Sequence, residues 1–457
     1  MADWNADLFV KLYSKMALAL GVTPSPSPNQ DTEMLELFEG QQPPRPRSLG
    51  ATQDSPFLLA IYNPGQYIPP QMDPATKVVD RYALSVLFDV VPQFSWVFKP
   101  AATTVSNAYK SILDYKEAPL VSLTPAQKEK LDAAQTYYDA NQADYYTYMD
   151  KYMVALDNYD AAYATFLNGG DPVPRSLKLK VKAAYDQWVA HHKEGVESAI
   201  AVIAQFEALE PSTFWYKLLD RYNQGTQESD LGTPFQVVGF SPPYKTWFQD
   251  AGWTTFTFDQ KDMDNQSNSD VIGVSGNLDL TFGIFKVSGS GNYNEDSSYK
   301  KMDQTTLNFS CQLMRVSLDR TWMNPLVFSS SAWRWAKGTP VYGTQFSSGA
   351  DIQGDIAPQG SMTVIPTAAI LSRNVKVSGA FDNTIVQDLN RQISADASVG
   401  IGPFAIAGRF NMEHHEGSQK GTIASDGIEA KDVQIVALVC EILPKSPNPD
   451  NNLPWPS

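Results

Sequence analysis

Apolar and polar residues alternate along two stretches of the chain, residues 271–293 and 393–412. In the first, every second position from Ile272 to Phe282 is apolar or glycine, and the positions between are glycine or polar. In the second, apolar positions from Ile393 to Ile401 alternate with serine, aspartate or glycine. A period of two predicts β-strand. In each stretch a glycine follows at which the chain can reverse its direction. This predicts a β-hairpin with arms of about nine or ten residues, long enough to span a bilayer.

The two stretches are copies of one pattern. When the first is moved along the chain without a gap, five residues coincide with identical ones, namely Ser275 with Ser394, Gly283 with Gly402, Phe285 with Phe404, Gly289 with Gly408 and Asn292 with Asn411. The copy continues beyond the hairpin, because residues 309–314 resemble residues 438–443. Each half is therefore predicted to contain a hairpin, a loop and a buried strand.

The only two cysteines of the chain, Cys311 and Cys440, occupy matching positions in these buried strands. If the two strands pair across a pseudo-twofold axis, the thiols approach each other. Otherwise they are two small buried hydrophobic side chains. Two cysteines do not imply a disulfide framework.

A period of seven runs through the segment after residue 124. Thr124, Pro125 and Gln127 supply an N-cap, a proline at the first helical position and a capping-box partner. Aromatic residues or leucine then recur at every seventh position, at Leu131, Tyr138, Tyr145, Tyr152, Tyr159 and Phe166. A heptad sustained over about six repeats indicates coiled-coil packing.

A second helix is predicted from about Arg175 to Leu209, with an apolar stripe that includes Val181, Trp188 and Ile203. The short connection after residue 167 makes the two helices antiparallel. A seam of tyrosines has a hydroxyl to satisfy at every level and packs less drily than leucine. It suits either a rod that parts from its partners and docks again, or a coiled coil with a solvated edge.

The predicted fold class is α+β, a long antiparallel, coiled-coil-like helical hairpin followed by an antiparallel, sandwich-like β domain of two related halves. Residues 1–120 hold a helix at residues 4–20, a proline-rich linker at residues 22–75 and short helices. The helical hairpin occupies residues 121–222 and the duplicated β domain residues 223–443. A proline-rich tail follows at residues 444–457.

Charge and hydropathy restrict the class of partner. The net charge of −15 disfavours nucleic acid, whose phosphates need a basic footprint, and it repels anionic lipid. No stretch is apolar enough for a transmembrane helix, and the first residues lack the pattern of a signal peptide. We therefore expect a protein made in soluble form in the cytoplasm, whose release or export, if any, follows a non-classical route.

Candidate chemistry is sparse. The four histidines form two adjacent pairs, and the second pair lies in the sequence Glu413-His414-His415-Glu416, which offers metal ligands if a turn brings them together. A solvated loop or a pH-responsive element explains the same residues. No familiar nucleophile, phosphate-binding or zinc motif occurs, so we expect no enzyme and no cofactor.

Three tryptophans and two arginines are concentrated in residues 317–335, at Arg320, Trp322, Trp333, Arg334 and Trp335. An aromatic and cationic cluster of this kind suits an aromatic ligand, a sugar or a lipid headgroup. It equally suits a corner that joins the two β halves, with the indoles filling a wide gap. The corner is the favoured interpretation.

Three functional hypotheses remain. In the first, a membrane-interacting, pore-forming protein inserts both hairpins, works as a homo-oligomer and has a lipid membrane as partner, a layout that resembles several soluble toxins. Its lipid-facing candidates are Leu278, Leu280, Phe282, Phe285, Val287, Val399, Ile401, Phe404 and Ile406. In the second, a non-enzymatic assembly or binding protein buries both hairpins permanently and uses the helical rod for partner contact. The third is an enzyme or metal-binding protein with an unfamiliar site.

Overall fold

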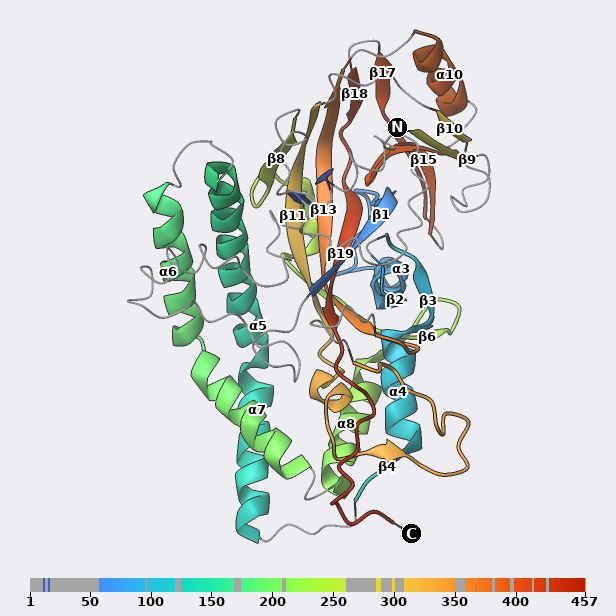
Figure 1. Ribbon diagram of the computed structural model, residues 1–457. Coiled ribbons are helices and arrows are strands. Elements are labelled where there is room, and N and C mark those ends of the chain that lie inside the picture. Colours follow the sequence, from blue (N-terminus) through green and yellow to red (C-terminus); the bar gives the residue numbers. More distant parts are fainter. Residues whose placement is uncertain are drawn as a thin grey trace.

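The computed structural model describes residues 11–12, 15–16, 57–95, 97–119, 125–167, 174–207, 211–259, 285–288, 298–300, 308–349, 358–379, 383–394, 398–412, 415–424 and 427–456. Within them the chain mixes helices with a large antiparallel sheet (Figure 1). The predicted helix at residues 4–20 is described at four residues, all helical, and Leu12 and Met16 are fully buried.

The large sheet has its longest strands at its centre. Strand β13 (Val364–Ser378) lies between β11 (Asn308–Asp319) and β19 (Gln434–Ile442). Strand β1 (Phe57–Tyr67) pairs with β19, whereas β7 (Gly239–Ser241) and β8 (Thr254–Phe258) pair with β11. Strand β18 (Gly427–Ala430) pairs with β13 and with β17 (Thr422–Ala424).

Four strands of this sheet end in one row. Phe309 of β11 is opposite Phe258 of β8 on one side and Val377 of β13 on the other, and Val377 is in turn opposite Ile428 of β18. The chain leaves the sheet after β8 and returns in β11, then leaves after β13 and returns through the edge strand β17 to β18, which pairs with β13. Residues 259–307 and 379–426 are therefore two insertions that start from the same end of neighbouring antiparallel strands.

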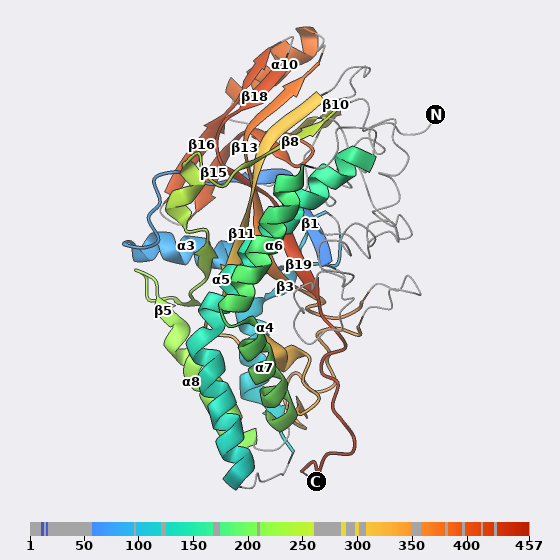
Figure 2. The same ribbon diagram turned by 90° about the vertical axis from the view of Figure 1, so that its left-hand side faces the viewer.

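A second, smaller sheet is built entirely from these insertions. Its order is β10 (Ser298–Lys300), β9 (Phe285–Ser288), β14 (Ser398–Ile401), β15 (Phe404–Met412) and β16 (His415–Lys420), all antiparallel. The first two strands come from the first insertion and the other three from the second. Together with helix α10 (Asn383–Ser394), this sheet lies toward the end of the molecule opposite the C-terminus (Figures 1 and 2).

A helical layer runs along one side of the large sheet (Figures 1 and 2). Helix α5 (Pro125–Leu167) contacts α6 (Arg175–Ala190) and α7 (Lys193–Glu207). The five heptad positions from Leu131 to Tyr159 are buried, as their spacing predicts. The rings of Tyr145 and Trp188 lie 5.4 Å apart and those of Tyr152 and Tyr185 5.7 Å apart, so the two segments run antiparallel.

The second predicted helix is not continuous, and the prediction from Arg175 to Leu209 is wrong on this point. The chain breaks between α6 and α7 at the first histidine pair, where His192 has φ 71°. His191 stacks on Tyr148 with ring centroids 3.6 Å apart, and the Tyr137 hydroxyl lies 3.2 Å from Nδ1 of His192. Contacts with α5 therefore stabilise a break that local sequence preference does not signal.

Three further segments differ from the sequence-based prediction. Residues 57–67, assigned to the linker, form β1, because the apolar run Phe57–Ile61 pairs with β19. Helix α8 (Pro211–Gly225) lies where the helical signal was expected to fade, and Phe214, Leu218 and Tyr222 bury one face of it. Helix α10 lies within the region predicted to be β-rich, with Leu389 buried.

Polar contacts attach α5 to its neighbours. Ser317 of β11 donates a hydrogen bond to Asp150, and Nε of Arg315 lies 4.0 Å from the same carboxylate. Thr254 of β8 donates to Asn158 at 3.1 Å. Burial raises the pKa of Asp150, although Arg315 and the bond from Ser317 act in the opposite direction. A buried carboxyl group therefore lies between the helical layer and the sheet.

The remaining elements complete the layer around the sheet. Figure 1 shows α3 and α4 on the side away from α5 and α6. The bounds of the elements not yet given are α3 Val78–Asp89, β2 Val90–Pro92, β3 Pro100–Thr104, α4 Val105–Tyr115, β4 Lys116–Glu117, β5 Thr226–Glu228, β6 Pro234–Gln236, η1 Tyr244–Phe248, η3 Pro325–Phe328 and β12 Arg334–Trp335.

The buried carboxylate predicts a pH-dependent difference between the wild type and Asp150→Asn. Because the pKa of Asp150 is raised in the folded state, its contribution to stability is full below the ordinary value of 3.8 and is lost as pH rises through the folded pKa. Relative to Asp150→Asn, the wild type should therefore gain stability as pH falls from 7 toward 4. Chemical denaturation across this range measures the difference.

Asp132→Asn is the matched control, because Asp132 forms an exposed ion pair with Lys217 on α8. Exposed pairs contribute about 0–1 kcal/mol, so this substitution should change the free energy of unfolding little. Parallel stability curves for the wild type and Asp150→Asn between pH 4 and 7 would contradict the prediction.

Candidate functional site

The second repeat segment forms a short hairpin in the small sheet. Strands β14 and β15 pair through a turn at Gly402, whose φ is 52°, and Pro403. A positive φ is costly for most side chains, which accounts for the glycine. The four lipid-facing candidates of this copy, Val399, Ile401, Phe404 and Ile406, are each no more than 1% exposed.

The first arm of this hairpin is shorter than the sequence predicts. Residues 393 and 394 belong to the end of α10, and β14 begins only at Ser398. The amphipathic α10 uses the same residues that would extend the strand. The alternation of residues 393–401 is thus compatible with a helix end followed by a strand, and the prediction of a full-length arm is wrong for this state.

The first repeat segment is described only in part. Leu278, Leu280 and Phe282 lie outside the described residues, whereas Phe285 and Val287 lie on β9. Strand β9 pairs with β14, with Val287 opposite Val399, and also with β10. The two copies of the repeat therefore meet edge to edge within one sheet.

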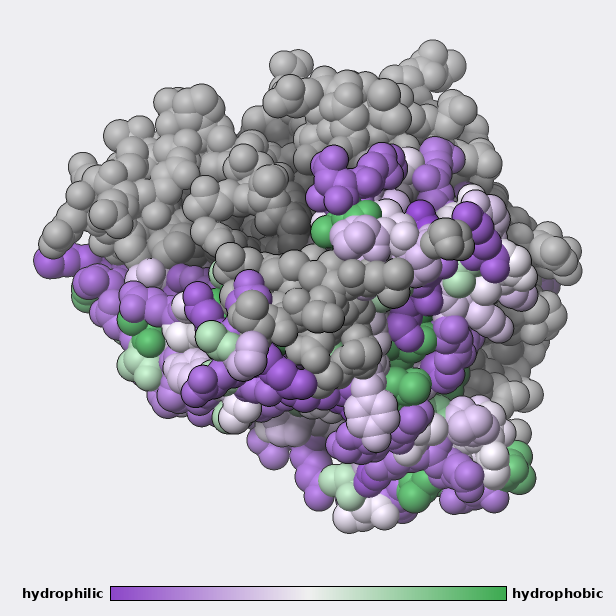
Figure 3. Space-filling view, turned by 90° about the horizontal axis from the view of Figure 1, so that it is seen from below, coloured by the Kyte–Doolittle hydropathy of each residue, from purple (hydrophilic) through white to green (hydrophobic). Residues whose placement is uncertain are grey.

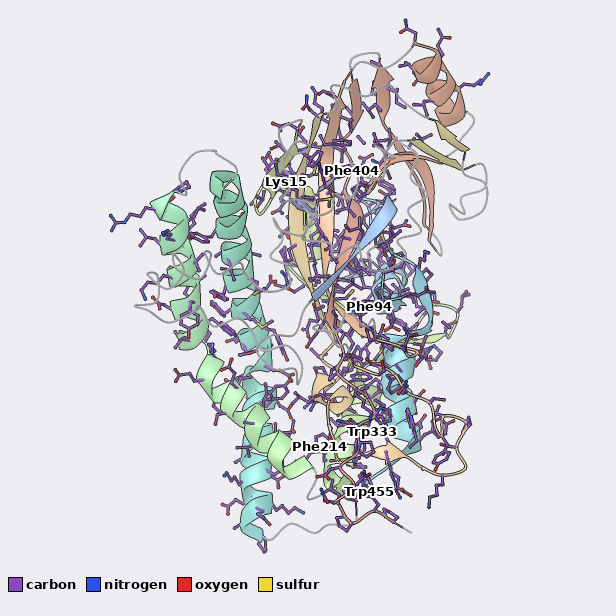
Figure 4. All side chains as sticks on the ribbon, viewed as in Figure 1. Lys15, Phe94, Phe214, Trp333, Phe404 and Trp455 are labelled. Carbon is purple, nitrogen blue, oxygen red and sulfur yellow. The ribbon has the colours of Figure 1, made fainter. Side chains whose placement is uncertain are left out.

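The second hairpin packs against the large sheet through apolar side chains. The ring of Phe404, labelled in Figure 4, lies 6.3 Å from that of Phe309, which belongs to the row of strand ends. Leu389 of α10 and Ile423 of β17 join the same core. Each fully buried apolar side chain contributes about 1.5–3 kcal/mol, so this packing holds the hairpin firmly.

One backbone segment of the hairpin is held by side-chain amides. The amide group of Gln434, on β19, accepts a hydrogen bond of 2.6 Å from Ala405 N and donates one of 3.1 Å to Ala405 O. Nε2 of Gln419 donates to the same carbonyl at 3.0 Å. Gly65 of β1 is so close that a Cβ atom there would lie 2.6 Å from Gln434 Oε1 and 2.8 Å from Pro403 O.

Sequence reasoning missed this contact. The signal that could have found it is a glutamine in the otherwise apolar run from Val433 to Val439, where a buried polar group needs a partner.

Trp333 of the predicted aromatic and arginine cluster lies toward the opposite end of the molecule (Figure 4). All three indoles are buried, and each donates a hydrogen bond to a backbone carbonyl, Trp322 to Val237, Trp333 to Val327 and Trp335 to Thr344. Seen from below, the described surface is mostly hydrophilic with separate apolar spots (Figure 3). The indoles therefore act as core residues.

The two arginines of the cluster serve different parts of the fold. Arg320 is buried and donates to Phe88 O at 2.8 Å and Pro366 O at 2.6 Å. Its burial lowers the pKa of the guanidinium, and nearby Asp89 opposes this. Arg334 donates to Glu117 at 2.5 Å and lies over the ring of Trp455 at 4.9 Å, so it fastens the C-terminal tail.

The two cysteines do not approach each other, because β13 separates their strands. Cys311 lies on β11 and Cys440 on β19, and both are buried and unpaired. Burial raises the pKa of the Cys311 thiol to about 12 and raises that of Cys440 as well.

The second histidine pair gives no metal centre within the described residues. Glu413 and His414 lie outside them, and His415 and Glu416 lie on β16, opposite Met412 and Asn411. No group of three or more histidine, cysteine, aspartate or glutamate side chains in the described part of the chain is arranged to hold a metal ion.

None of the described helices is both long enough and apolar enough to cross a membrane.

The aromatic cluster predicts a large loss of stability on truncation of a central indole. Trp333→Ala should lower the free energy of unfolding by about 3–5 kcal/mol, because it removes a fully buried side chain and its hydrogen bond to Val327. Trp455→Ala, at a partly exposed position, should cost clearly less. Denaturant unfolding of both variants measures the difference, and equal, small losses would contradict a core role for Trp333.

The chain matches no protein-family model, no curated protein and no solved structure.

Proposed function

We propose that this protein permeabilises lipid membranes by inserting its two repeat segments, residues 271–293 and 393–412, as amphipathic β-hairpins. It acts as a homo-oligomer, because two hairpins from one chain are too few strands to close a barrel. No catalytic step is part of this proposal.

The observation that carries the proposal is the row of strand ends at Phe258, Phe309, Val377 and Ile428. Each insertion leaves one strand and returns in its antiparallel neighbour, so straightened arms would continue strands that are already paired. Both insertions leave at the same end of the sheet. Two hairpins extended in this way would lie side by side.

The length and pattern of the insertions agree with this use. Half of either insertion, about 24 residues, extends about 80 Å as a β-strand, against about 30 Å for the hydrocarbon core of a bilayer. The alternation of apolar and polar residues matches the lipid-facing and lumen-facing sides of a barrel strand. In the packed state the apolar residues of the second copy are hidden, which an inserting segment requires before it meets a membrane.

A non-enzymatic assembly or binding protein is the second candidate. The observation that favours it is the full burial of Val399 and Ile401, which a hairpin that never leaves the core also requires. The two candidates differ in what the protein does to a bilayer, so a leakage assay separates them.

The first experiment mixes the purified protein with dye-loaded liposomes at pH 7 and at pH 5. We expect concentration-dependent release of dye at one or both pH values, together with lipid-bound oligomers seen by chemical cross-linking. Intact liposomes at both pH values, with a particle whose size lipid does not change, would favour the assembly protein instead.

The second experiment compares neighbouring positions on opposite faces of the first copy. Leu280→Asp places a charge on the predicted lipid face, where it costs about 2–4 kcal/mol near the bilayer centre, and should abolish leakage. Thr281→Asp places the same charge on the predicted lumen face and should preserve leakage. Both variants must show the circular dichroism spectrum of the wild type. Equal leakage from the two variants would place the inserting segment elsewhere.

The second copy gives the same comparison between Val399→Asp and Ser398→Asp. Because Val399 is fully buried in the packed state, Val399→Asp also tests folding, and its stability is measured before its leakage. Loss of leakage in both copies would show that both hairpins insert.

A further inference from the structure

We propose that Gln434 is the positioning residue that helps to keep the second hairpin packed, and that breaking its contact with Ala405 makes this hairpin open more often from the large sheet. The consequence for membranes depends on the proposed function, whereas the release itself does not.

The contact joins the large and the small sheet, between which the described strands form no pairing. Gln434 lies on β19 between its strand partners Tyr67 and Ser372, and its side chain is fully buried. Its amide reaches β15 of the small sheet and both accepts from and donates to Ala405. One side chain thus reproduces the pair of hydrogen bonds that a neighbouring strand would make.

The contact also satisfies groups that would otherwise be costly. Ala405 is buried, and a buried peptide N–H and C=O without partners are strongly disfavoured. Gln419 shares the carbonyl, but the N–H of Ala405 depends on Gln434. Because the N–H has this partner only while the hairpin is packed, the contact favours the packed state specifically.

The turn of the hairpin rests on a second, steric contact. Strand β1 has a register irregularity between Ile61 and Gln66, and Gly65 lies within it. A methyl group on Gly65 would meet Gln434 Oε1 at 2.6 Å and the backbone oxygens of Pro403 and Ile435 at 2.8 Å each, all closer than a Cβ atom tolerates. The absence of a side chain at Gly65 therefore lets the turn and the glutamine approach together.

Hydrogen exchange measured by mass spectrometry on peptides covering residues 398–412, without lipid, tests the release directly. In Gln434→Leu we expect exchange of this segment to become about tenfold faster or more, the effect of losing about one or two net hydrogen bonds. Gln236→Leu is the control, because Gln236 is also buried but contacts Thr226. It should leave the exchange of residues 398–412 unchanged.

Two further variants keep the proposal testable if Gln434→Leu does not fold. Gly65→Ala should speed exchange of the same segment without removing any hydrogen-bonding group. Gln434→Glu should loosen the hairpin at neutral pH, where the carboxylate has no proton to donate to Ala405 O, and restore it in acid, where the protonated acid donates again. A merely structural defect would not recover on acidification.

Exchange that stays at the wild-type rate in Gly65→Ala and in Gln434→Glu at pH 7 overturns the positioning role. Faster exchange with dye release at lower protein concentration supports both the positioning role and the membrane function. Faster exchange with no release of dye by any variant or by the wild type supports the positioning role and rejects the membrane function.

Discussion

In the ladder between β11 and β13, backbone hydrogen bonds join residues 308–317 to residues 368–378, and this pairing sets where the other elements attach. It places the C-terminal end of the first insertion beside the N-terminal end of the second. Strands β8 and β18 then extend the same row on either side. The two copies of the repeat meet in the small sheet because their anchoring strands are neighbours in the large one.

The helical layer and the small sheet are held to the large sheet in different ways. Helix α5 meets β11 through a carboxylate, a hydroxyl and an arginine, whereas Tyr145 and Tyr152 of its seam contact Trp188 of α6. The second hairpin meets the sheet through apolar side chains and one pair of amide hydrogen bonds. Apolar packing is lost gradually as surfaces separate, whereas a hydrogen bond is short-ranged and directional. The amide contact is therefore the sharper determinant of when the hairpin is in place.

The sequence predicted those features that depend on local period. The buried tyrosines from Tyr138 to Tyr159 followed from the heptad, and strand β15 matches the second arm of the predicted hairpin. Strand β1 was missed because prolines on either side outweighed a short apolar run, which becomes a strand only by pairing with the distant β19. The break at His192 was missed because its cause lies in Tyr137 and Tyr148, on another helix. The row of strand ends and the role of Gln434 depend on register between distant segments, which no local pattern encodes.

The two buried cysteines have a consequence for the covalent chemistry of the folded chain. Only the thiolate reacts with oxidants or disulfides, and burial raises the pKa of both thiols far above neutral pH. With β13 between their strands, the two sulfur atoms have no route to a bond within one folded chain. While the sheet stays folded, neither thiol is therefore poised to form a disulfide bond.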